Sequence, residues 1–275
     1  MSFKKDICFF GMNKVGKTSI IRVIFNKMHP QDTQYIDSTV EPEMSEVEFK
    51  GFYKFNIMDF PGAYEASDIK PSEKEILMDC GAVIYVAHSR PDYIHETSKQ
   101  LKEFYKLMMD LNPSASLNIF FHQSDIDFYN EDKTNESMRI LMDSVESIID
   151  PSFQNTGASK QKIAYYHTSI YDASIIESMS KVIKQLVETK FEHLGNMMND
   201  ISTACNLDKV YLFDMVTKIF FSSDFVPLDM DNFALCADML DVYMDFSCIY
   251  GEKQDNNNDK DESLANFEPY EQVIR

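Results

Sequence analysis

Short apolar runs alternate with helix-length segments along the first two thirds of the chain. This order is typical of a parallel sheet covered by helices on both faces. The runs predict strands at 7–10, 55–59, 82–87, 117–122 and 163–168, with a more polar strand at 47–49. Helical patterns predict helices at 18–28, 93–110, 134–149 and 173–188. The pattern therefore predicts an α/β domain with a mostly parallel six-stranded sheet.

The pattern changes after residue 189. A helix is predicted at 191–205, two strand-like runs at 210–215 and 218–222, and a long helix at 231–250. The two runs are so close in sequence that only a tight hairpin can join them. Because a two-stranded sheet is marginally stable alone, this smaller α+β unit is expected to pack against another surface.

We therefore expect three parts in the chain. Residues 1–189 form the larger α/β domain, and residues 190–251 form the smaller one. Residues 252–275 are rich in Asp, Glu and Asn and poor in apolar side chains. That composition is typical of a disordered, acidic tail.

Composition limits the classes of partner. A formal net charge of −19 argues against nucleic acid as a partner and against adhesion to anionic lipid. Five scattered cysteines indicate small core residues in a reducing compartment. We see no signal peptide, no apolar run long enough to span a membrane and no lipidation motif at either end. We expect a cytoplasmic protein without a direct membrane anchor, whose partners are proteins.

The clearest motif is a phosphate-binding loop that begins at Gly11 and fits G-x-x-x-x-G-K-[ST] between a predicted strand and a predicted helix. Backbone N–H groups in such a loop converge on phosphate oxygens at the N-terminus of the helix. Lys17 is expected to reach the β- and γ-phosphates, and the hydroxyl of Thr18 is expected to bind Mg²⁺. The expected phosphate-binding residues of this segment are Gly11, Asn13, Lys14, Val15, Gly16, Lys17, Thr18 and Ser19.

A second motif, D-x-x-G at Asp59 to Gly62, follows a predicted strand. Ligands of open α/β sheets bind at the carboxyl ends of strands. Asp59 is expected to bind Mg²⁺ through a water molecule, and the N–H of Gly62 is expected to contact the γ-phosphate. Thr39 lies in a polar segment between the two motifs and is expected to complete the Mg²⁺ shell when the γ-phosphate is present, which would make this loop a switch. Ser38 is the alternative for that role.

A guanine-selecting segment is predicted from His122 to Asp125, after the strand at 117–122. The carboxylate of Asp125 can accept hydrogen bonds from guanine N1–H and the exocyclic amine, which adenine cannot donate. His122 and Gln123 are expected to line the base, and backbone at Ser169 and Ile170 is expected to meet guanine O6. The segment favours GTP or GDP over the alternative of an ATP-using kinase or ATPase.

Taken together, these residues resemble Rag GTPases, the Ras-like regulators of nutrient signalling, and among them the C/D-type subunits. The resemblance covers about residues 1–251. It is carried by the segments Asp59–Gly62, Gly81–Val86, His122-x-x-Asp125, Thr168–Asp172, Tyr211–Asp214, Val226–Met230 and Ser247–Gly251.

The resemblance implies a Ras-like GTPase domain at 1–189 followed by an incomplete roadblock-like dimerisation domain at 190–251. It implies a GTP/GDP switch that uses Mg²⁺ and forms an obligate heterodimer with an A/B-type Rag subunit. It also implies recruitment to the lysosomal or vacuolar membrane through a scaffold complex, relay of amino-acid availability to the TOR kinase complex, and control by GTPase-activating and exchange proteins.

Three features depart from the family pattern. Ala63 stands where the family usually has the glutamine that orients the attacking water, so no catalytic residue is assigned and slow hydrolysis is expected. Gln123 replaces a lysine whose stem lines the base pocket. The later strands and final helix expected after Gly251 are replaced by the acidic tail. Because of Ala63, the alternative function is a constitutively GTP-bound scaffold subunit that acts mainly by dimerising.

Overall fold

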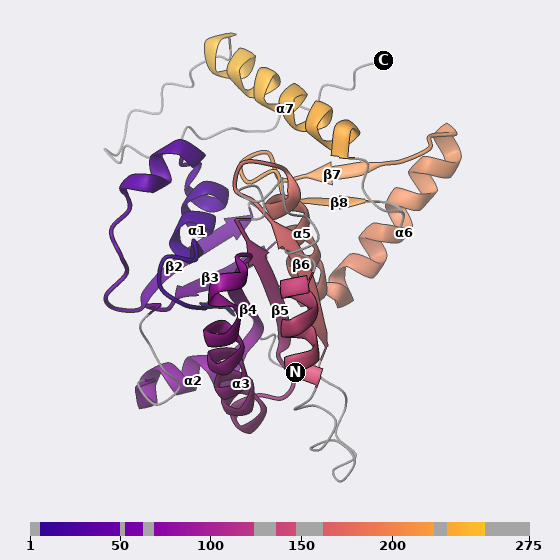
Figure 1. Ribbon diagram of the computed structural model, residues 1–275. Helices are drawn as coiled ribbons and strands as arrows, with labels where there is room; N and C mark the ends of the chain where they lie inside the picture. Colours follow the sequence, from indigo (N-terminus) through magenta and orange to yellow (C-terminus); the bar gives the residue numbers. More distant parts are fainter. Residues whose placement is uncertain are drawn as a thin grey trace, which may run out of the picture. The chain divides into compact units, whose positions relative to one another are not determined.

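The chain contains two compact units, residues 1–235 and 236–275, and the boundary falls within the last helix. The predicted domains, 1–189 and 190–251, divide the chain elsewhere and stay a prediction. The computed structural model (Figure 1) describes residues 6–49, 53–62, 69–123, 136–146, 162–222 and 230–250.

Six strands form one sheet in the order β2-β3-β1-β4-β5-β6. β2 pairs antiparallel with β3, and the other four pairs are parallel. This arrangement confirms the predicted α/β class with a mostly parallel six-stranded sheet. In chain order the strands are β1 (Asp6–Phe10), β2 (Glu43–Phe49), β3 (Tyr53–Asp59), β4 (Cys80–His88), β5 (Ser116–His122) and β6 (Ile163–Thr168).

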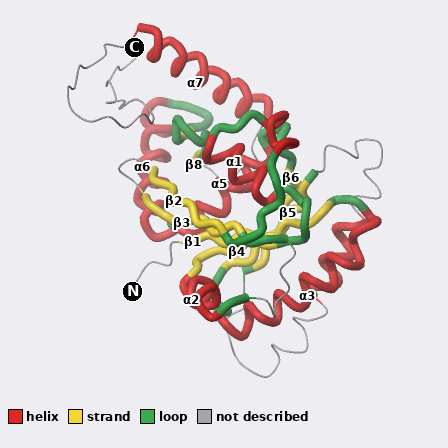
Figure 2. The backbone as a smooth tube through the Cα atoms, turned by 90° about the vertical axis from the view of Figure 1, so that its left-hand side faces the viewer, coloured by secondary structure: helices red, strands yellow, loops and turns green. Residues whose placement is uncertain are grey.

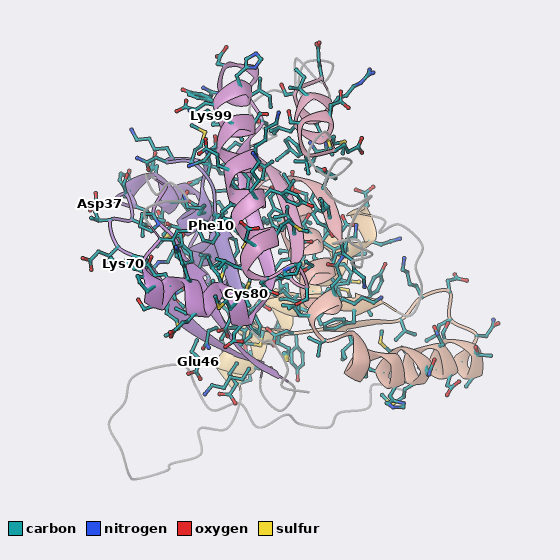
Figure 3. The ribbon with its side chains drawn as sticks, turned by 90° about the horizontal axis from the view of Figure 1, so that it is seen from below. Phe10, Asp37, Glu46, Lys70, Cys80 and Lys99 are labelled. Carbon is teal, nitrogen blue, oxygen red and sulfur yellow. The ribbon has the colours of Figure 1, made fainter. Side chains whose placement is uncertain are left out.

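Helices cover both faces of this sheet, as Figure 2 shows. Along β1, Ile7 and Phe9 point into the core shared with α1 and α5, whereas Cys8 and Phe10 point into the core shared with α2 and α3. This two-sided burial explains why a central strand such as β1 is a continuous apolar run. Figure 3 shows Phe10 among the interior side chains and Lys99 of α3 pointing outward. The helices are α1 (Lys17–Asn26), α2 (Pro71–Asp79), α3 (Ile94–Leu111) and α5 (Ser174–Leu186), with a helical segment at 136–146 and short 3-10 helices η1 (Pro30–Tyr35) and η2 (Pro91–Tyr93).

Helix α2 is absent from the predicted elements. It has only nine residues and a weak apolar pattern, in which Leu77 is the fully buried side chain. Its N-terminus carries the signal that identifies it. Pro71 occupies the first position, and the backbone N–H of Lys70 donates to Glu73 Oε2 at 2.9 Å, as in a capping box.

The prediction that the cysteines are small core residues holds for Cys8 and Cys80 but not for Cys205, which is exposed. A hydrogen bond with Cys80, followed by burial, raises the pKa of the Cys8 thiol well above its ordinary value. Because the thiolate is the reactive form, this shift lowers the reactivity of Cys8 at neutral pH.

The segment after the large sheet has the predicted order of helix, hairpin and helix: α6 (Glu188–Cys205), β7 (Tyr211–Phe213), β8 (Phe220–Ser222) and α7 (Met230–Tyr250). The strands are shorter than predicted because the residues between them form a turn. Asp214 Oδ2 accepts from the backbone N–H and the hydroxyl of Thr217 at 2.7 and 2.8 Å. Lys218 then adopts a left-handed conformation, with a φ of 59°.

The hairpin packs against α5. The N–H of Phe220 donates to Ser180 Oγ at 3.1 Å. Ile219 is 1% exposed and belongs to the core shared with α1 and α5, and Phe221 packs against that core. Helix α5 and the core beneath it thus supply the surface against which the two-stranded sheet was expected to pack. A roadblock-like identity for this segment stays a prediction.

The acidic tail predicted at 252–275 lies outside the described residues. Within the described ranges, no helix combines the length and the apolar character needed to cross a membrane.

Candidate functional site

The loop between β1 and α1 carries the phosphate-binding motif at the carboxyl end of the parallel strands. Gly11 and Gly16 have φ values of 140° and 96°, which favour glycine. A Cβ at Gly11 would lie 2.1 Å from the carbonyl oxygen of Val86, so a side chain there would collide with β4. The predicted phosphate-binding residues that lie together in this loop and the first turn of α1 are Gly11, Asn13, Lys14, Val15, Gly16, Lys17, Thr18 and Ser19.

Lys17 is buried, with 6% of its surface exposed. Its ammonium group donates to the backbone carbonyl oxygens of Gly11 and Met12, each at 2.9 Å. Burial lowers the pKa of Lys17 to about 8, although the nearby charge of Asp59 acts in the opposite direction. A buried cation is costly unless an anion accompanies it, so a phosphate group in this loop would stabilise Lys17.

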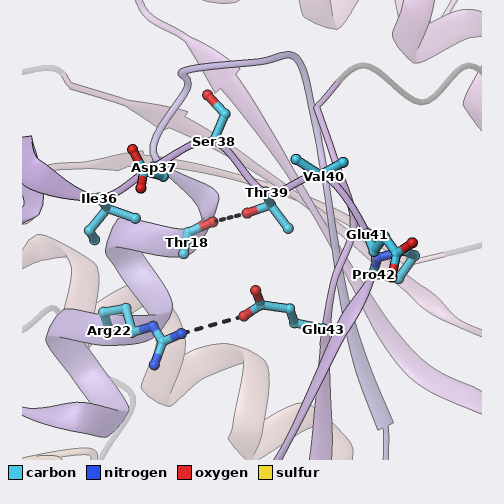
Figure 4. A pocket seen from close by; sticks show the side chains of 10 residues that line it. All are labelled: Thr18, Arg22, Ile36, Asp37, Ser38, Thr39, Val40, Glu41, Pro42 and Glu43. Atoms are coloured by element: carbon cyan, nitrogen blue, oxygen red, sulfur yellow. Dashed lines mark hydrogen bonds and ion pairs between the residues drawn. The ribbon is translucent and has the colours of Figure 1, made fainter.

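Three side-chain oxygens meet beside the loop, from α1, the segment before β2, and the end of β3. The hydroxyl of Thr18 donates to Asp59 Oδ2 at 2.5 Å, and the hydroxyls of Thr18 and Thr39 lie 2.8 Å apart (Figure 4). Asp59 is 4% exposed, and its Oδ1 has no hydrogen-bond partner among the described residues. Burial raises the pKa of Asp59, while Thr18, Lys17 and Thr39 lower it.

This oxygen set fits a magnesium ion. Mg²⁺ prefers oxygen ligands and commonly keeps several waters. A buried carboxylate oxygen without a partner requires an explanation, and a hydrated cation beside Asp59 supplies one. The residues that would hold the ion are Thr18 and Thr39, with Asp59 acting through water. Across the described ranges, no group of three or more His, Cys, Asp and Glu side chains is arranged to hold a metal.

Gly62 lies directly against the phosphate-binding loop. A Cβ at this position would lie 2.4 Å from Asn13 Cα, 2.5 Å from Asn13 N and 2.6 Å from Met12 O. The close approach therefore requires glycine, and it brings the end of the D-x-x-G motif to the phosphate side of the site. The contact between Gly62 and a γ-phosphate stays a prediction. Ala63 lies outside the described residues.

An open cavity of about 520 Å³ lies next to Thr18 and is lined by Thr18, Arg22 and residues 36–43 (Figure 4). An ion pair between Arg22 and Glu43, at 3.4 Å, crosses it. Both side chains are largely exposed, so the pair contributes little to stability. Val40, which is 80% exposed, belongs to the same segment as Thr39. Since so little of this segment is buried, it can change position at low cost.

His122, the last residue of β5, is 1% exposed. Its Nδ1 lies 3.0 Å from the hydroxyl of Thr168 at the end of β6. On its other side, a Cβ built on Gly16 would lie 2.6 Å from His122 Cδ2. The ring therefore lies between the phosphate-binding loop and β6. The predicted contact between His122 and guanine stays a prediction.

Gln123 has a left-handed backbone, with a φ of 62°. Its carbonyl oxygen accepts from Ser89 Oγ at 3.0 Å, and the N–H of Ser89 donates to the carbonyl oxygen of His122 at 3.2 Å. Ser89 is fully buried. Ser89 is not among the predicted site residues, because a single serine after a strand carries no motif. Asp125, the predicted guanine-selecting residue, lies outside the described residues.

The loop after β6 is shaped by its own hydrogen bonds. The N–H of Ser169 donates to Ser174 Oγ at 2.9 Å, and Ser169 Oγ accepts from the N–H of Tyr171 at 3.1 Å. Ser169 is fully buried, and Ile170 packs against the core shared with α1 and α5. Because the N–H of Ser169 already has a partner, a bond from it to a base would require a change in this loop. The roles predicted for Ser169 and Ile170 stay predictions.

Comparison with known proteins gives a family match. Residues 6–240 match the Gtr1/RagA G protein conserved region. Ras-related GTP-binding protein C of mouse and the same protein of human are each 33% identical over 259 residues, which cover 93% of this chain and 62% of theirs. GTP-binding protein gtr2 of Schizosaccharomyces pombe is 29% identical over 247 residues, covering 90% of this chain and 76% of its own length.

This chain therefore spans about six tenths of the length of the mouse and human C proteins. Among solved structures, the mammalian SRP receptor aligns with a TM-score of 0.47 and 14% identity over 66% of this chain. A likeness at that level says nothing about function.

Proposed function

The chain belongs to the Gtr1/RagA family of G proteins, and on that premise we propose that it is a Mg²⁺-dependent GTP/GDP switch, the C/D-type subunit of a Rag heterodimer. The resemblance to C/D-type subunits is confirmed, because mouse Ras-related GTP-binding proteins C and D are both 33% identical to it. The observation that supports the switch most directly is the convergence of Lys17, Thr18, Thr39 and Asp59 beside the phosphate-binding loop.

In this proposal, Lys17 exchanges its two carbonyl partners for oxygens of the β- and γ-phosphates. Thr18 and Asp59 hold Mg²⁺ in both nucleotide states. Mg²⁺, when bound, would supply positive charge that neutralises part of the phosphate charge. Thr39 joins the metal only when the γ-phosphate is present, so its exposed segment has two positions. Partner proteins read the difference between them.

The proposal is tested by titrating the chain with fluorescent GTP, GDP and ATP in Mg²⁺, as wild type and as Asp125→Ala. We expect selective binding of the guanine nucleotides by the wild type and loss of that selectivity in the variant. Hydrogen bonds to a base edge discriminate strongly because the site's polar groups are otherwise left unpaired. Equal binding of ATP and GTP by the wild type would refute the proposal.

Slow hydrolysis is the second part of the proposal. A methyl group at Ala63 cannot orient a water molecule, whereas a glutamine amide can. We expect Ala63→Gln to raise the single-turnover rate of GTP hydrolysis by about tenfold or more, with GTP affinity unchanged. An equal rate in the two proteins would contradict this role for position 63.

Ala63 also favours a second candidate function, a scaffold subunit that stays GTP-bound and acts mainly by dimerising. The two functions differ in the nucleotide that the chain carries in cells. A scaffold carries GTP under all nutrient conditions, whereas a switch changes its ratio of GTP to GDP. Nucleotide extracted from the immunoprecipitated chain, before and after amino-acid starvation, distinguishes them.

We place the heterodimer at the lysosomal or vacuolar membrane, where a scaffold complex recruits it and the TOR kinase complex responds to it. Activating and exchange proteins set its nucleotide state. Support comes from the family and the C- and D-type relatives. Co-expression with an A/B-type Rag subunit, followed by size exclusion, tests pairing. Separate elution of the two chains would contradict the heterodimer.

A further inference from the structure

We propose that Ser89 is a positioning residue for base recognition. Its buried hydroxyl holds the backbone of Gln123 in a left-handed conformation, and this conformation sets the direction in which the chain enters the segment predicted to select guanine. The inference rests on the proposed binding of guanine nucleotides and deepens it. Part of the base selectivity is thereby assigned to a residue that directly follows β4 and lies outside the guanine-selecting segment itself.

Ser89 and Gln123 are the first residues beyond a pair of aligned strands. The ladder between β4 and β5 ends at the pairing of His88 with His122. The N–H of Ser89 still donates to the carbonyl oxygen of His122, at 3.2 Å. The carbonyl oxygen of Gln123 then accepts from the Ser89 side chain, at 3.0 Å. A hydroxyl group thus binds the backbone at the point where the two strands stop pairing.

The backbone of Gln123 depends on this support. Its φ is 62°, in a region that is unfavourable for most residues with a Cβ atom. In the described ranges, Gln123 has no hydrogen bond other than the one from Ser89. Residues persist in such conformations only where their surroundings hold them. Loss of the hydroxyl would therefore let Gln123 relax toward ordinary backbone angles.

The hydroxyl of Ser89 is itself held in a fixed place. Ser89 is fully buried. The residue before it, His88, accepts at Nδ1 from the N–H of Arg90 at 3.1 Å, and its ring stacks on that of Tyr93 with 5.2 Å between the centroids. A buried hydroxyl cannot exchange its protein partner for water without cost. Ser89 is therefore the rigid member of the pair, and Gln123 is the residue that it holds.

The consequence for the base follows from the length of chain involved. Asp125, the predicted guanine-selecting residue, lies outside the described residues but follows Gln123 by only two positions. Two residues span at most about 7 Å, so a backbone rotation at Gln123 changes where the carboxylate of Asp125 can lie. Hydrogen bonds weaken steeply when their distance and angle change. Ser89 thus influences guanine recognition without touching the nucleotide.

The experiment compares the affinity of the whole chain for GDP and IDP, each carrying the same ribose fluorophore, in Mg²⁺. IDP lacks the exocyclic amine that Asp125 is predicted to bind, so the ratio of the IDP to the GDP dissociation constant measures guanine selectivity. We expect Ser89→Ala to weaken GDP binding about fivefold, the equivalent of one hydrogen bond. IDP has less to lose, so the ratio should fall about twofold or more.

Two variants at position 123 test the conformation itself. Asparagine adopts a left-handed backbone readily, whereas β-branched valine does not. Both lose the glutamine side chain, so the difference between them reports on the backbone. Gln123→Val should be less selective than Gln123→Asn, although Ser89 is present in both. Adding Ser89→Ala to Gln123→Asn should lower the ratio less than Ser89→Ala does in the wild type.

The matched control is Ser98→Ala. Ser98 is also buried, and it donates to Ser144 Oγ at 2.7 Å. This variant should keep the wild-type ratio. The inference is overturned if Ser89→Ala has the same ratio as Ser98→Ala, or if it weakens GDP and IDP equally. If Ser89→Ala fails to fold, equal selectivity of Gln123→Val and Gln123→Asn overturns it. A wild-type chain that binds neither nucleotide refutes the proposed function, on which the inference rests.

Discussion

The phosphate side and the base side of the site differ in what their buried polar groups bind. On the phosphate side, the ammonium of Lys17 donates to neutral carbonyl oxygens, and Asp59 Oδ1 has no partner among the described residues. On the base side, His122, Thr168 and Ser169 are paired with other protein groups. Bound phosphate and metal would give the groups on the phosphate side better partners. The groups on the base side already have hydrogen-bond partners without a ligand.

This difference gives the two sides of the site different roles. Groups that gain better partners from a ligand can drive a change in conformation, because only differential interaction shifts an equilibrium. Groups that are satisfied without a ligand keep the strand ends in place. We infer that switching takes place at Thr39, Asp59 and Gly62, and that His122 and Thr168 form a fixed frame.

Substitution of Lys17 should have the largest effect. Lys17→Met removes the charge that would contact phosphate, and we expect affinity for GTP and GDP to fall roughly a hundredfold. Burial lowers the pKa of Lys17 to about 8, so the charged form is less favourable in the folded chain without ligand than it is in water. The Tm of the nucleotide-free variant should therefore equal or exceed that of the wild type. A lower Tm together with retained affinity would contradict both expectations.

Gly62→Ala should have the next largest effect. The added methyl group would collide with the backbone of Met12 and Asn13 and push the segment away from the phosphate-binding loop. We expect roughly tenfold weaker binding of GTP and little change for GDP, because only GTP carries the γ-phosphate that this segment is predicted to contact. Gly195→Ala is the control, since a Cβ there has nothing within 4 Å in the described part of the chain. Equal losses for GTP and GDP in Gly62→Ala would argue against a γ-phosphate role.

A smaller effect is expected at Thr39. Thr39→Ala removes the hydroxyl that lies 2.8 Å from that of Thr18. We expect about fivefold weaker GTP binding in Mg²⁺, the size of one ordinary hydrogen bond, and unchanged GDP binding. Thr39→Ser should restore the wild-type value. Ser38→Ala tests the alternative, and a larger GTP-specific loss in that variant would assign the role to Ser38.

The smallest effect on nucleotide is expected for the contact between α5 and the hairpin. Ser180→Ala removes the acceptor for the N–H of Phe220, which should lower the free energy of unfolding by about 1 kcal/mol without altering GDP release. Ser178→Ala is matched to it, because Ser178 is also buried in α5 and donates to the carbonyl four residues earlier. Equal losses of stability in the two variants would show that the bond to Phe220 contributes nothing.

The centre of the large sheet could be predicted from the sequence because β1, β4 and β5 are buried on both faces and are therefore continuous apolar runs. Helix α2 could not be recognised from periodicity, since its nine residues make less than three turns and bury mainly Leu77. The predicted lengths of the two hairpin strands are too great for a different reason. Propensity extends them to Met215 and Lys218, but the side chain of Asp214 closes a turn before those residues can pair.

Most residues on the phosphate side of the site could be located because they fall in fixed spacings within two short motifs, whereas Thr39 lies between the motifs. The base side depends on contacts between residues far apart in sequence. Ser89 directly follows β4, whereas His122 and Thr168 end β5 and β6, and nothing in their local sequence shows that they meet. The buried position of His122, between Gly16 and Thr168, could not be predicted from its place in the motif.

Displacement of bound fluorescent GDP tests the central claim most directly. The chain is loaded with this nucleotide in Mg²⁺, and unlabelled GTP, GDP or ATP is added in increasing amounts. We predict displacement by GTP and GDP at similar concentrations and none by ATP even at roughly a hundredfold higher concentration. Displacement by ATP as readily as by GTP, or failure of the chain to hold GDP at all, would contradict the claim that this site is a guanine-nucleotide switch.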